Sequence, residues 1–544
     1  MFKRPELLLV ALLAAAALPA GAVRPKLDED PRALVPAAPD ACTPQIRKGT
    51  AWGVATAAYQ IEGAWNVSGR TPSVWDVYAH IPGKIKDGDT GDVACDHYHR
   101  YKEDFKLMKE MGVKHYRFSI SWNRVLPGGG RGSAVNPAGV DFYNRLLDEM
   151  QANGITPAAT MFHWDLPQSL HERYLGPLGD SEFVEDFANY ADVLFKSFPR
   201  IKQWMTFNEP LITCDASYGV GKFAPGYKGG IPGIYKCAHN VLLSHGRVKQ
   251  LSRTKYAHLD HKIGIALNVE WAEPMSNTTW DREAAQRSVD IQFGVYADPL
   301  FLGRYPELLK KKFGPSVMKD FTPEEADMVR GSADFLGINH YTSRFVRANE
   351  QPLGFVVSVF GRDSQPIGPV AQSSWLRVVP DGLYKITQYA SKRYGNPEIW
   401  ITENGVSAPN EAEMPVDHAV RDAFRTKYYS DYLDALCRSK RDGARITKYL
   451  AWSFMDNFEW LQGYSERFGV VHVDFKSGSL KRAVKDSGRF LSKHFFSVGA
   501  ADAPADGAQK KPSGGKQSDA KQPEAKRPRG GGGSEDRRRG KDSE

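Results

Sequence analysis

The chain has few cysteines, five among 544 residues, and no cysteine or histidine spacing that matches a structural zinc site. After the first 22 residues it also lacks an apolar run of the ~20 residues that cross a bilayer. The formal net charge is +8, but much of the basic excess lies in the last few dozen residues. We therefore expect no metal site, no nucleic-acid partner and no stable membrane insertion of the main body.

Apolar runs that favour strands are what the sequence has in abundance, and amphipathic segments with helical spacing separate them. The strand-like runs are 52–59, 115–121, 156–163, 203–207, 262–269, 335–341, 398–402 and 449–454. The helical segments include 101–111, 137–153, 181–198, 234–256 and 417–438. Such alternation predicts a parallel sheet, and eight units in roughly 450 residues favour an α/β fold with a single (β/α)8 TIM barrel and long βα loops.

The two ends of the chain differ from this body. Basic residues, an apolar run over 7–18 and the small residues Ala20-Gly21-Ala22 predict a signal peptide over 1–22. An uncleaved signal anchor is the alternative, but the run is shorter than the ~20 residues needed to span a bilayer. A secreted or lumenal protein is expected, and the sequons at Asn66 and Asn277 are candidate glycosylation sites.

The remaining boundaries follow from composition. Residues 23–48 are expected to form a flexible lead-in, 49–498 the barrel domain, and 499–544 a disordered basic tail rich in Gly, Lys and Arg. The basic clusters of the tail leave open a nuclear signal or a tether to an anionic polymer, but the signal peptide argues against a nuclear address.

Five cysteines cannot all pair within one chain. Cys214 and Cys237 flank a loop rich in Gly and Pro, and in an oxidising compartment they are the expected disulfide. Cys95 is expected to be a buried free thiol. The sequence assigns no partner to the other two cysteines.

Two short acidic motifs carry the chemistry. Thr-Phe-Asn-Glu-Pro and Ile-Thr-Glu-Asn-Gly place Glu209 and Glu403 at the ends of strand-like runs, immediately before a turn. Barrel enzymes hold their active sites at these strand ends. Two carboxyl groups suit hydrolysis of a glycosidic bond, because one protonates the leaving oxygen while the other meets the anomeric carbon. The alternative interpretation is that each glutamate caps a following helix.

Four more motifs follow other strands, namely Gln-Ile-Glu-Gly-Ala at 60–64, His-Trp-Asp-Leu-Pro at 163–167, Asn-His-Tyr at 339–341 and the aromatic segment 452–460. In this order the six motifs resemble glycoside hydrolase family 1, the β-glucosidase family, over about residues 49–496. The resemblance implies that Glu209 is the acid/base and Glu403 the nucleophile of a retaining mechanism, with their carboxyl groups ~5–5.5 Å apart.

The resemblance also implies roles for the surrounding side chains. The residues expected to orient the nucleophile are Arg117, Asn339 and Tyr341. The residues expected to bind the sugar are Gln60, His163, Asn208, Tyr341, Trp452, Glu459 and Trp460. Trp375 is expected on the leaving-group side. Taken singly, each Trp, Tyr or His here is more often a core residue than a ligand contact. No cofactor is required by this chemistry.

The sequence therefore predicts a retaining exo-β-glycosidase, specifically a β-glucosidase that releases terminal β-D-glucosyl residues from oligosaccharides or from aryl and alkyl glucosides. The alternatives are a transglycosidase using the same site and a catalytically silent relative that binds a glycan or protein. The presence of Glu209 and Glu403 argues against the silent relative. Acidic residues at Glu459 and Glu466 argue against a phosphorylated sugar, which they would repel. Oligomeric state and the choice among glucose, fucose and galactose stay open.

Overall fold

The computed structural model describes residues 36–350 and 353–498. The expected signal peptide, the basic tail and residues 23–35 of the expected lead-in lie outside these ranges. None of the helices in the described ranges combines the length and the apolar character needed to cross a membrane.

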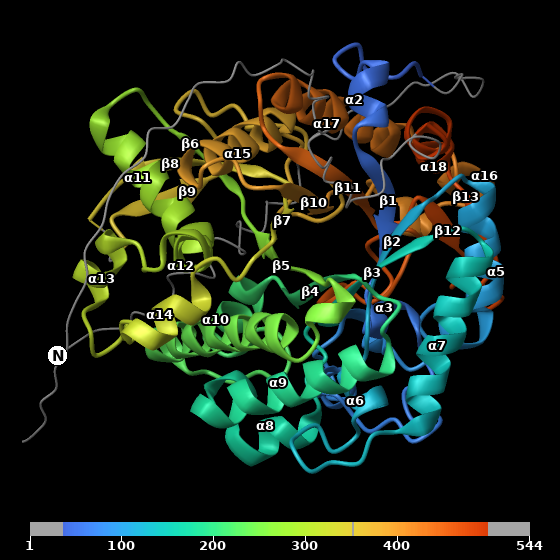
Figure 1. Ribbon diagram of the computed structural model, residues 1–544. Helices are drawn as coiled ribbons and strands as arrows, with labels where there is room; N and C mark the ends of the chain where they lie inside the picture. Colours follow the sequence, from blue (N-terminus) through green and yellow to red (C-terminus); the bar gives the residue numbers. More distant parts are fainter. Residues whose placement is uncertain (1–35, 351–352, 499–544) are drawn as a thin grey trace, which may run out of the picture. The chain divides into compact units, whose positions relative to one another are not determined.

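Eight parallel strands close into a barrel at the centre of Figure 1, in the order β1-β11-β10-β7-β5-β4-β3-β2. Their bounds are β1 Ala51–Ala55, β2 His115–Ser119, β3 Thr156–Phe162, β4 Gln203–Asn208, β5 Lys262–Asn268, β7 Phe335–Asn339, β10 Ile399–Glu403 and β11 Ile446–Trp452. All eight lie within two or three residues of the predicted runs at their first residue. The predicted (β/α)8 barrel is confirmed.

Long helices surround the barrel (Figure 1). They are α5 His97–Glu110, α7 Pro137–Ala152, α9 Asp180–Ser197, α10 Gly230–Thr254, α15 Pro380–Arg393 and α17 Ala423–Arg441. In α9, acidic residues occupy the first turn and Lys196 the last, as the helix dipole favours. Phe183, Phe187 and Leu194 of the same helix are buried at near-helical spacing. The amphipathic pattern thus predicts which face of α9 packs inward.

Short elements make up the long βα connections, and one short helix precedes β1. The strands outside the barrel are β6 Trp271–Pro274, β8 Ser343–Ala348, β9 Phe355–Ser358, β12 Val471–Val473 and β13 Arg482–Val484. The shorter helices are α2 Pro44–Lys48, α3 Ala58–Ile61, α4 Val74–Ala79, α6 Trp122–Val125, α8 Gln168–Tyr174, α11 Thr279–Val289, α12 Val295–Leu302, α13 Glu307–Phe313, α14 Pro323–Val329, α16 Val416–Ala419 and α18 Asp486–Leu491. A π-helical turn, η3 Ile212–Ser217, follows β4.

Buried side chains fill the end of the barrel at which the strands begin. Ala158, Met205, Phe335 and Trp400 form one buried cluster, in which the Phe335 and Trp400 rings stack with centroids 3.6 Å apart. Phe335 begins β7, so this packing lies toward the amino ends of the strands. The interior is therefore a core rather than a pore, and space for a ligand remains only at the carboxyl ends.

Two predicted elements are corrected. The strand predicted over 52–59 ends at Ala55, and its last residues form helix α3 instead. The helix predicted over 417–438 is split into α16 and α17. At this break the Asp422 carboxylate is buried, pairs with Arg425 and accepts a hydrogen bond from the Ser487 backbone N–H at 2.8 Å. A buried polar anchor, which periodicity does not reveal, ends the first helix.

Disulfides tie two parts of the chain together. Cys214 and Cys237 are bonded and Cys95 is a buried free thiol, as predicted. A second disulfide joins Cys42 to Cys437. The flexible lead-in is therefore a wrong prediction for its last residues, because Cys42 is bonded to α17 and residues 44–48 form helix α2. The disulfide partner lies 395 residues away, so no local pattern in the sequence reveals it.

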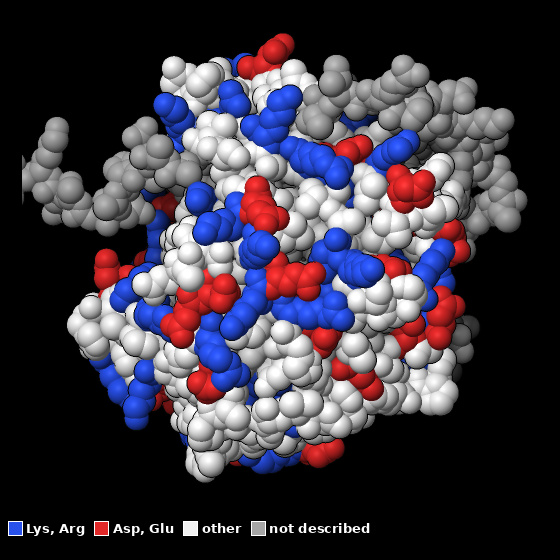
Figure 2. Space-filling model, turned by 90° about the vertical axis from the view of Figure 1, so that its right-hand side faces the viewer, with Lys and Arg blue, Asp and Glu red and all other residues white. Residues whose placement is uncertain are grey.

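The surface carries charges of both signs. On the face shown in Figure 2, blue Lys and Arg side chains are interspersed with red Asp and Glu side chains. One surface ion pair of the described residues joins Arg200 Nη1 to Asp148 Oδ1 at 2.6 Å. A face of this kind lacks the single-sign stripe that typifies nucleic-acid binding.

Candidate active site

A cavity of about 220 Å³ is lined by residues from the carboxyl ends of the barrel strands. The predicted site residues among its lining are His163, Asn208, Glu209, Asn339, Tyr341, Trp375, Glu403, Trp452, Glu459 and Trp460. Gln60 and Arg117 do not line it and instead contact residues that do. The structure thus brings together the predicted catalytic, nucleophile-orienting, sugar-binding and leaving-group residues from segments that are far apart in sequence.

Glu403 is the last residue of β10, and both of its carboxylate oxygens are held by hydrogen-bond donors. Arg117 Nη1 lies 2.6 Å from Oε1, and the Tyr341 hydroxyl donates to Oε2 at 2.7 Å. Arg117 and Glu403 are both buried. A buried guanidinium and a phenol stabilise the charged form of a carboxyl group.

Glu209 has different surroundings. It follows β4 directly with a φ of 46°, an uncommon conformation for a residue with a side chain. Asn339 Nδ2 donates to Oε1 of Glu209 at 2.8 Å, and Thr402 donates to Oδ1 of Asn339 at 2.6 Å, which fixes the orientation of the amide. No cation pairs with Glu209 among the described residues.

The two carboxyl groups differ in how readily they lose a proton. Burial, and then the charge of Glu403, raise the pKa of Glu209 to about 8. Burial also raises the pKa of Glu403, while Arg117 and the Tyr341 hydroxyl act to lower it. Because only Glu403 has a cation and a phenol on its oxygens, it ionises first and Glu209 keeps its proton. The site therefore pairs an anionic carboxylate with a protonated acid.

Asn208 links the two glutamates through its amide. Its Oδ1 accepts from Arg117 Nη2 at 2.6 Å and from Asn339 Nδ2 at 3.0 Å, and its Nδ2 contacts His163 Nε2 at 2.9 Å. Burial, and then Arg117, lower the pKa of His163 well below its ordinary value. His163 is therefore neutral, and its buried Nδ1 has no hydrogen-bond partner in the described chain. That nitrogen is available to a ligand.

Gln60 and Glu459 form a second polar pair. Gln60 Nε2 donates to the Phe458 carbonyl at 2.9 Å and approaches Glu459 Oε2 at 3.4 Å, while its buried Oε1 has no partner within the described ranges. Burial, and then Glu466 and Glu403, raise the pKa of Glu459 well above its ordinary value. A carboxyl group that holds a proton can both donate to and accept from hydroxyl groups.

Aromatic rings complete the cavity. The His163 ring stacks with Trp452 at 5.8 Å and with Trp460 at 6.1 Å between centroids. The rings of Trp375 and Tyr341 pack edge to face, with their centroids 5.8 Å apart. Directed polar atoms beside aromatic surface are the combination that binds a sugar ring, whose hydroxyls need partners and whose C–H face is apolar.

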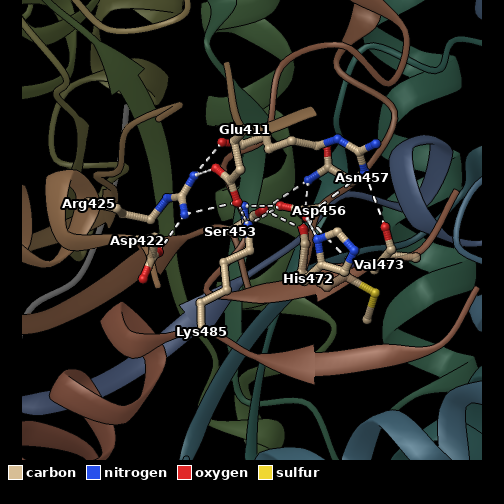
Figure 3. Close-up of polar contacts among 12 residues, drawn as sticks. Glu411, Asp422, Arg425, Ser453, Asp456, Asn457, His472, Val473 and Lys485 are labelled. Carbon is tan, nitrogen blue, oxygen red and sulfur yellow. Dashed lines mark hydrogen bonds and ion pairs between the residues drawn. The ribbon is translucent and has the colours of Figure 1, made fainter. Parts of the chain in front are cut away.

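A buried charge network supports the segment that carries Trp452 to Trp460 (Figure 3). Asp456 Oδ1 lies 2.7 Å from Lys485 Nζ and accepts from the Gly469 N–H at 3.0 Å. Lys485 also pairs with Glu411, which pairs in turn with Arg425. The sequence motif includes Asp456, but its partners lie elsewhere in the chain and no local pattern predicts them.

The sequence missed part of the cavity wall. Asp215, Asn268 and Glu270 line the cavity, and each has a buried oxygen without a hydrogen-bond partner in the described residues. Asp215 lies six residues after Glu209, a spacing that gave no signal by itself. Within the described ranges, the cavity included, no group of three or more His, Cys, Asp or Glu is arranged to hold a metal ion. The sequons at Asn66 and Asn277 are exposed.

Comparison with known proteins agrees with this site. The family model for glycosyl hydrolase family 1 matches residues 43–497. Beta-glucosidase 4 of Oryza sativa subsp. japonica is 43% identical over 456 residues, which cover 82% of this chain and 94% of the rice protein. A GH1 beta-glucosidase from Humicola insolens, solved with glucose, superposes with a TM-score of 0.80 at 41% identity, covering 82% of this chain and 97% of that chain.

Beta-glucosidase 2 of Trichoderma reesei, solved with Tris, also gives a TM-score of 0.80, at 44% identity over 84% of this chain and 99% of that chain. Each of these matches covers 82–84% of this chain, and the family model spans the whole barrel. The chain belongs to glycosyl hydrolase family 1.

Proposed function

We propose that the protein is a retaining β-glucosidase that hydrolyses terminal, non-reducing β-D-glucosyl residues. The observation that carries this proposal is the asymmetry of the two carboxyl groups. Arg117 and Tyr341 hold the oxygens of Glu403, whereas Glu209 has, among the described residues, only the neutral amide of Asn339 as a side-chain donor. One anionic nucleophile and one protonated acid are the two groups that a retaining glycosidase needs.

In the first step the Glu403 carboxylate attacks the anomeric carbon, and the Glu209 carboxyl group gives its proton to the leaving oxygen. Arg117 and Tyr341 position the attacking oxygen, in line with their contacts at 2.6 and 2.7 Å. The product is a covalent glycosyl ester on Glu403. Asn208 Nδ2 contacts one acceptor among the described residues, His163 Nε2, so its second hydrogen can bind the sugar 2-hydroxyl. This contact strengthens as positive charge develops on the ring.

In the second step the roles reverse. Esterification removes the negative charge of Glu403, which is one of the causes that raise the pKa of Glu209. The pKa of Glu209 then falls, so the same side chain can take a proton from water while the water oxygen attacks the anomeric carbon. The ester bond breaks, Glu403 leaves as a carboxylate, and Glu209 keeps the proton for the next cycle. The pairing of the two glutamates thus explains how one residue acts as acid and then as base.

The cavity offers the sugar both polar side chains that can bind its hydroxyl groups and aromatic side chains that can pack against its ring. His163 Nδ1 and Gln60 Oε1 are buried and unpaired within the described residues, and hydroxyl groups of a glycone would satisfy both. Glu459 is close to Gln60 and can accept or donate. Trp452 and Trp460 supply apolar surface to the ring.

The test is release of nitrophenol from 4-nitrophenyl β-D-glucoside by the protein lacking residues 1–22, beside its Glu403→Gln variant. We expect turnover by the first and none by the second, with both proteins folded. The matching galactoside and fucoside rank the glycone preference. A folded wild-type protein without activity on any of the three would contradict the proposal.

We also propose that the protein is secreted or lumenal. The N-terminal sequence, two disulfides and two exposed sequons support this. Expression with the native N-terminus in a eukaryotic host should yield protein in the secretory pathway whose mobility changes on enzymatic removal of N-glycans. The change should be lost in the Asn66→Gln/Asn277→Gln variant. Retention of the protein in the cytosol would contradict the assignment.

A further inference from the structure

Asp215 is a buried carboxyl group that the two-step reaction does not use. Its residue exposure is 2%, it lines the cavity that contains Glu209 and Glu403, and its Oδ1 has no hydrogen-bond partner in the described chain. No Lys, Arg or His of the described residues forms an ion pair with it. A buried, unpaired acceptor costs free energy unless a ligand satisfies it.

The position of Asp215 is fixed by its surroundings. It lies in η3, which begins three residues after Glu209, and the N–H groups of Gly219 and Val220 donate to its backbone carbonyl at 3.0 and 2.8 Å. The preceding residue, Cys214, is bonded to Cys237 on α10. Asp215 therefore belongs to a covalently anchored turn, next to the residue that protonates the leaving group.

A second acceptor lines the same cavity. Glu270 is held by Arg344, whose Nη2 lies 2.9 Å from Oε1, while the buried Oε2 of Glu270 has no partner in the described ranges. Arg344 also donates to the backbone carbonyl of Trp375. Arg344 thus connects the acceptor to the tryptophan that the sequence placed on the leaving-group side.

The charges in the cavity favour a neutral ligand on the side lined by Asp215 and Glu270. Burial raises the pKa of Asp215 to about 7, so near neutral pH the carboxyl group is partly protonated. The exposed Lys222 lines the same cavity and would repel a cationic leaving group. The carboxyl groups of Asp215 and Glu270 would disfavour an anionic one. Hydroxyl groups are neutral donors that satisfy carboxyl oxygens.

We propose that Asp215 determines leaving-group specificity by hydrogen bonding to hydroxyl groups of the leaving group, so that glucosides of sugars and polyols are preferred to glucosides of apolar alcohols. The inference rests on the proposed β-glucosidase function and names the substrate class of that site. Asp215 acts on binding and orientation of the leaving group and takes no part in bond cleavage.

The test compares kcat/KM for cellobiose and for 4-nitrophenyl β-D-glucoside in the wild type, Asp215→Leu and Asp215→Asn. Both substrates carry the same glycone, so only the leaving group differs. We expect Asp215→Leu to lower kcat/KM for cellobiose about tenfold, the effect of losing one hydrogen bond in a buried site, and to change the value for the aryl glucoside less than about twofold. Asp215→Asn keeps the shape and one acceptor, and should show a smaller loss in the same direction.

Thr213→Val is the matched control. Thr213 lies in the same turn and is buried with an unpaired hydroxyl in the described chain, but it does not line the cavity. This variant should leave the ratio of the two kcat/KM values unchanged. If Asp215→Leu fails to fold, the same ratio measured on Asp215→Asn decides the question.

Transfer reactions give an independent readout, because an acceptor enters the site that the leaving group has vacated. Asp215→Leu should reduce glucosyl transfer to added glucose but leave transfer to methanol unchanged. Equal losses on both substrates, or an unchanged cellobiose value, would overturn the proposal for Asp215 while leaving the glucosidase function intact. Absence of all turnover in the wild type would instead overturn the glucosidase function.

Discussion

Arg117 and Glu403 form an ion pair across the barrel, with Nη1 2.6 Å from Oε1 and residue exposures of 0% and 4%. Arg117 lies in β2 and Glu403 ends β10, and two other strands, β11 and β1, separate these in the barrel order. The pair therefore exists only when the barrel is closed. A buried ion pair of this kind adds little net stability, so its value lies in holding the nucleophile ionised and oriented.

Replacing Arg117 should raise the pKa of Glu403, because burial would then act without the cation that opposes it. The nucleophile must be ionised, so the acidic limb of the kcat/KM profile should move to higher pH. We expect Arg117→Met to lower kcat/KM at its optimum by about a hundredfold or more, because the variant loses both the charge that keeps Glu403 ionised and the donor that orients it. The readout is a pH profile on 4-nitrophenyl β-D-glucoside.

Arg117→Lys should recover part of the lost kcat/KM and part of the shift of the acidic limb. It restores the positive charge but not the planar pair of N–H donors that contact Glu403 and Asn208. Arg100→Met is a control, because Arg100 forms a partly exposed pair with Asp96. A loss of activity in Arg117→Met with an unchanged acidic limb would contradict the electrostatic role.

The basic limb of the wild-type profile should report Glu209. Its pKa is raised to about 8 and the acid must carry a proton, so kcat/KM should fall as the pH rises through about 8. Trapping Glu403 as a fluoroglucosyl ester removes a neighbouring negative charge and should lower this pKa. Carbon NMR of labelled glutamate, in the free and the trapped protein, measures both values. An unchanged or higher pKa after trapping would contradict the coupling.

Loss of the acid should depend on the leaving group. Glu209→Ala should lower kcat/KM for an alkyl glucoside by about 10²–10⁴ and for a dinitrophenyl glucoside far less, because a good leaving group departs without a proton. Steady-state rates on the two substrates give the comparison. Thr213→Val, four residues further along, controls for disturbance of the turn. Equal losses on both substrates would mean that Glu209 is not the acid.

The extent to which the sequence predicts this structure depends on how local each signal is. Glu209 and Glu403 were predictable because each ends an apolar run before a turn, and strand ends of a barrel converge. Cys214 and Cys237 are 23 residues apart and flank one loop, whereas Cys42 and Cys437 are separated by 395 residues. No pattern along the chain brings such distant residues together.

Asp215 shows the same limit for the site. A single acidic residue in an apolar turn resembles any solvated aspartate until the fold shows that it is buried and lines the cavity. Asp215 becomes a candidate ligand contact because its buried Oδ1 has no hydrogen-bond partner among the described residues, and only the three-dimensional structure shows this. The long connections, whose strands β6, β8 and β9 were not predicted, are likewise set by contacts between loops rather than by periodicity.

The disulfide between Cys42 and Cys437 should stabilise the fold without affecting catalysis. It closes most of the chain into one loop, and Cys42→Ala/Cys437→Ala should lower the free energy of unfolding by roughly 2–5 kcal/mol. Neither residue lines the cavity, so kcat/KM should stay within about twofold of the wild type. Denaturant unfolding measures the fall in the free energy of unfolding.

The control is Cys95→Ala, which breaks no disulfide. An unchanged midpoint would show that residues 42–48 are ordered by packing alone.

The Asp456 network in Figure 3 should control sugar binding from behind the cavity. Asp456 is completely buried between Lys485 and the Gly469 N–H, and the next residue, Asn457, accepts a hydrogen bond from Gln60 at 3.0 Å. Asp456→Asn leaves Lys485 with one anion fewer, so the free energy of unfolding should fall by about 3–5 kcal/mol. The KM for glucosides should rise because the segment that carries the sugar contacts becomes less rigid. The pH profile is set by the two glutamates and should not change.

The control is Asp431→Asn, which breaks an exposed ion pair and should lower the free energy of unfolding by less than about 1 kcal/mol. A shifted pH profile in Asp456→Asn would show that the network acts on the glutamates themselves, and an unchanged KM would show that it only stabilises the fold.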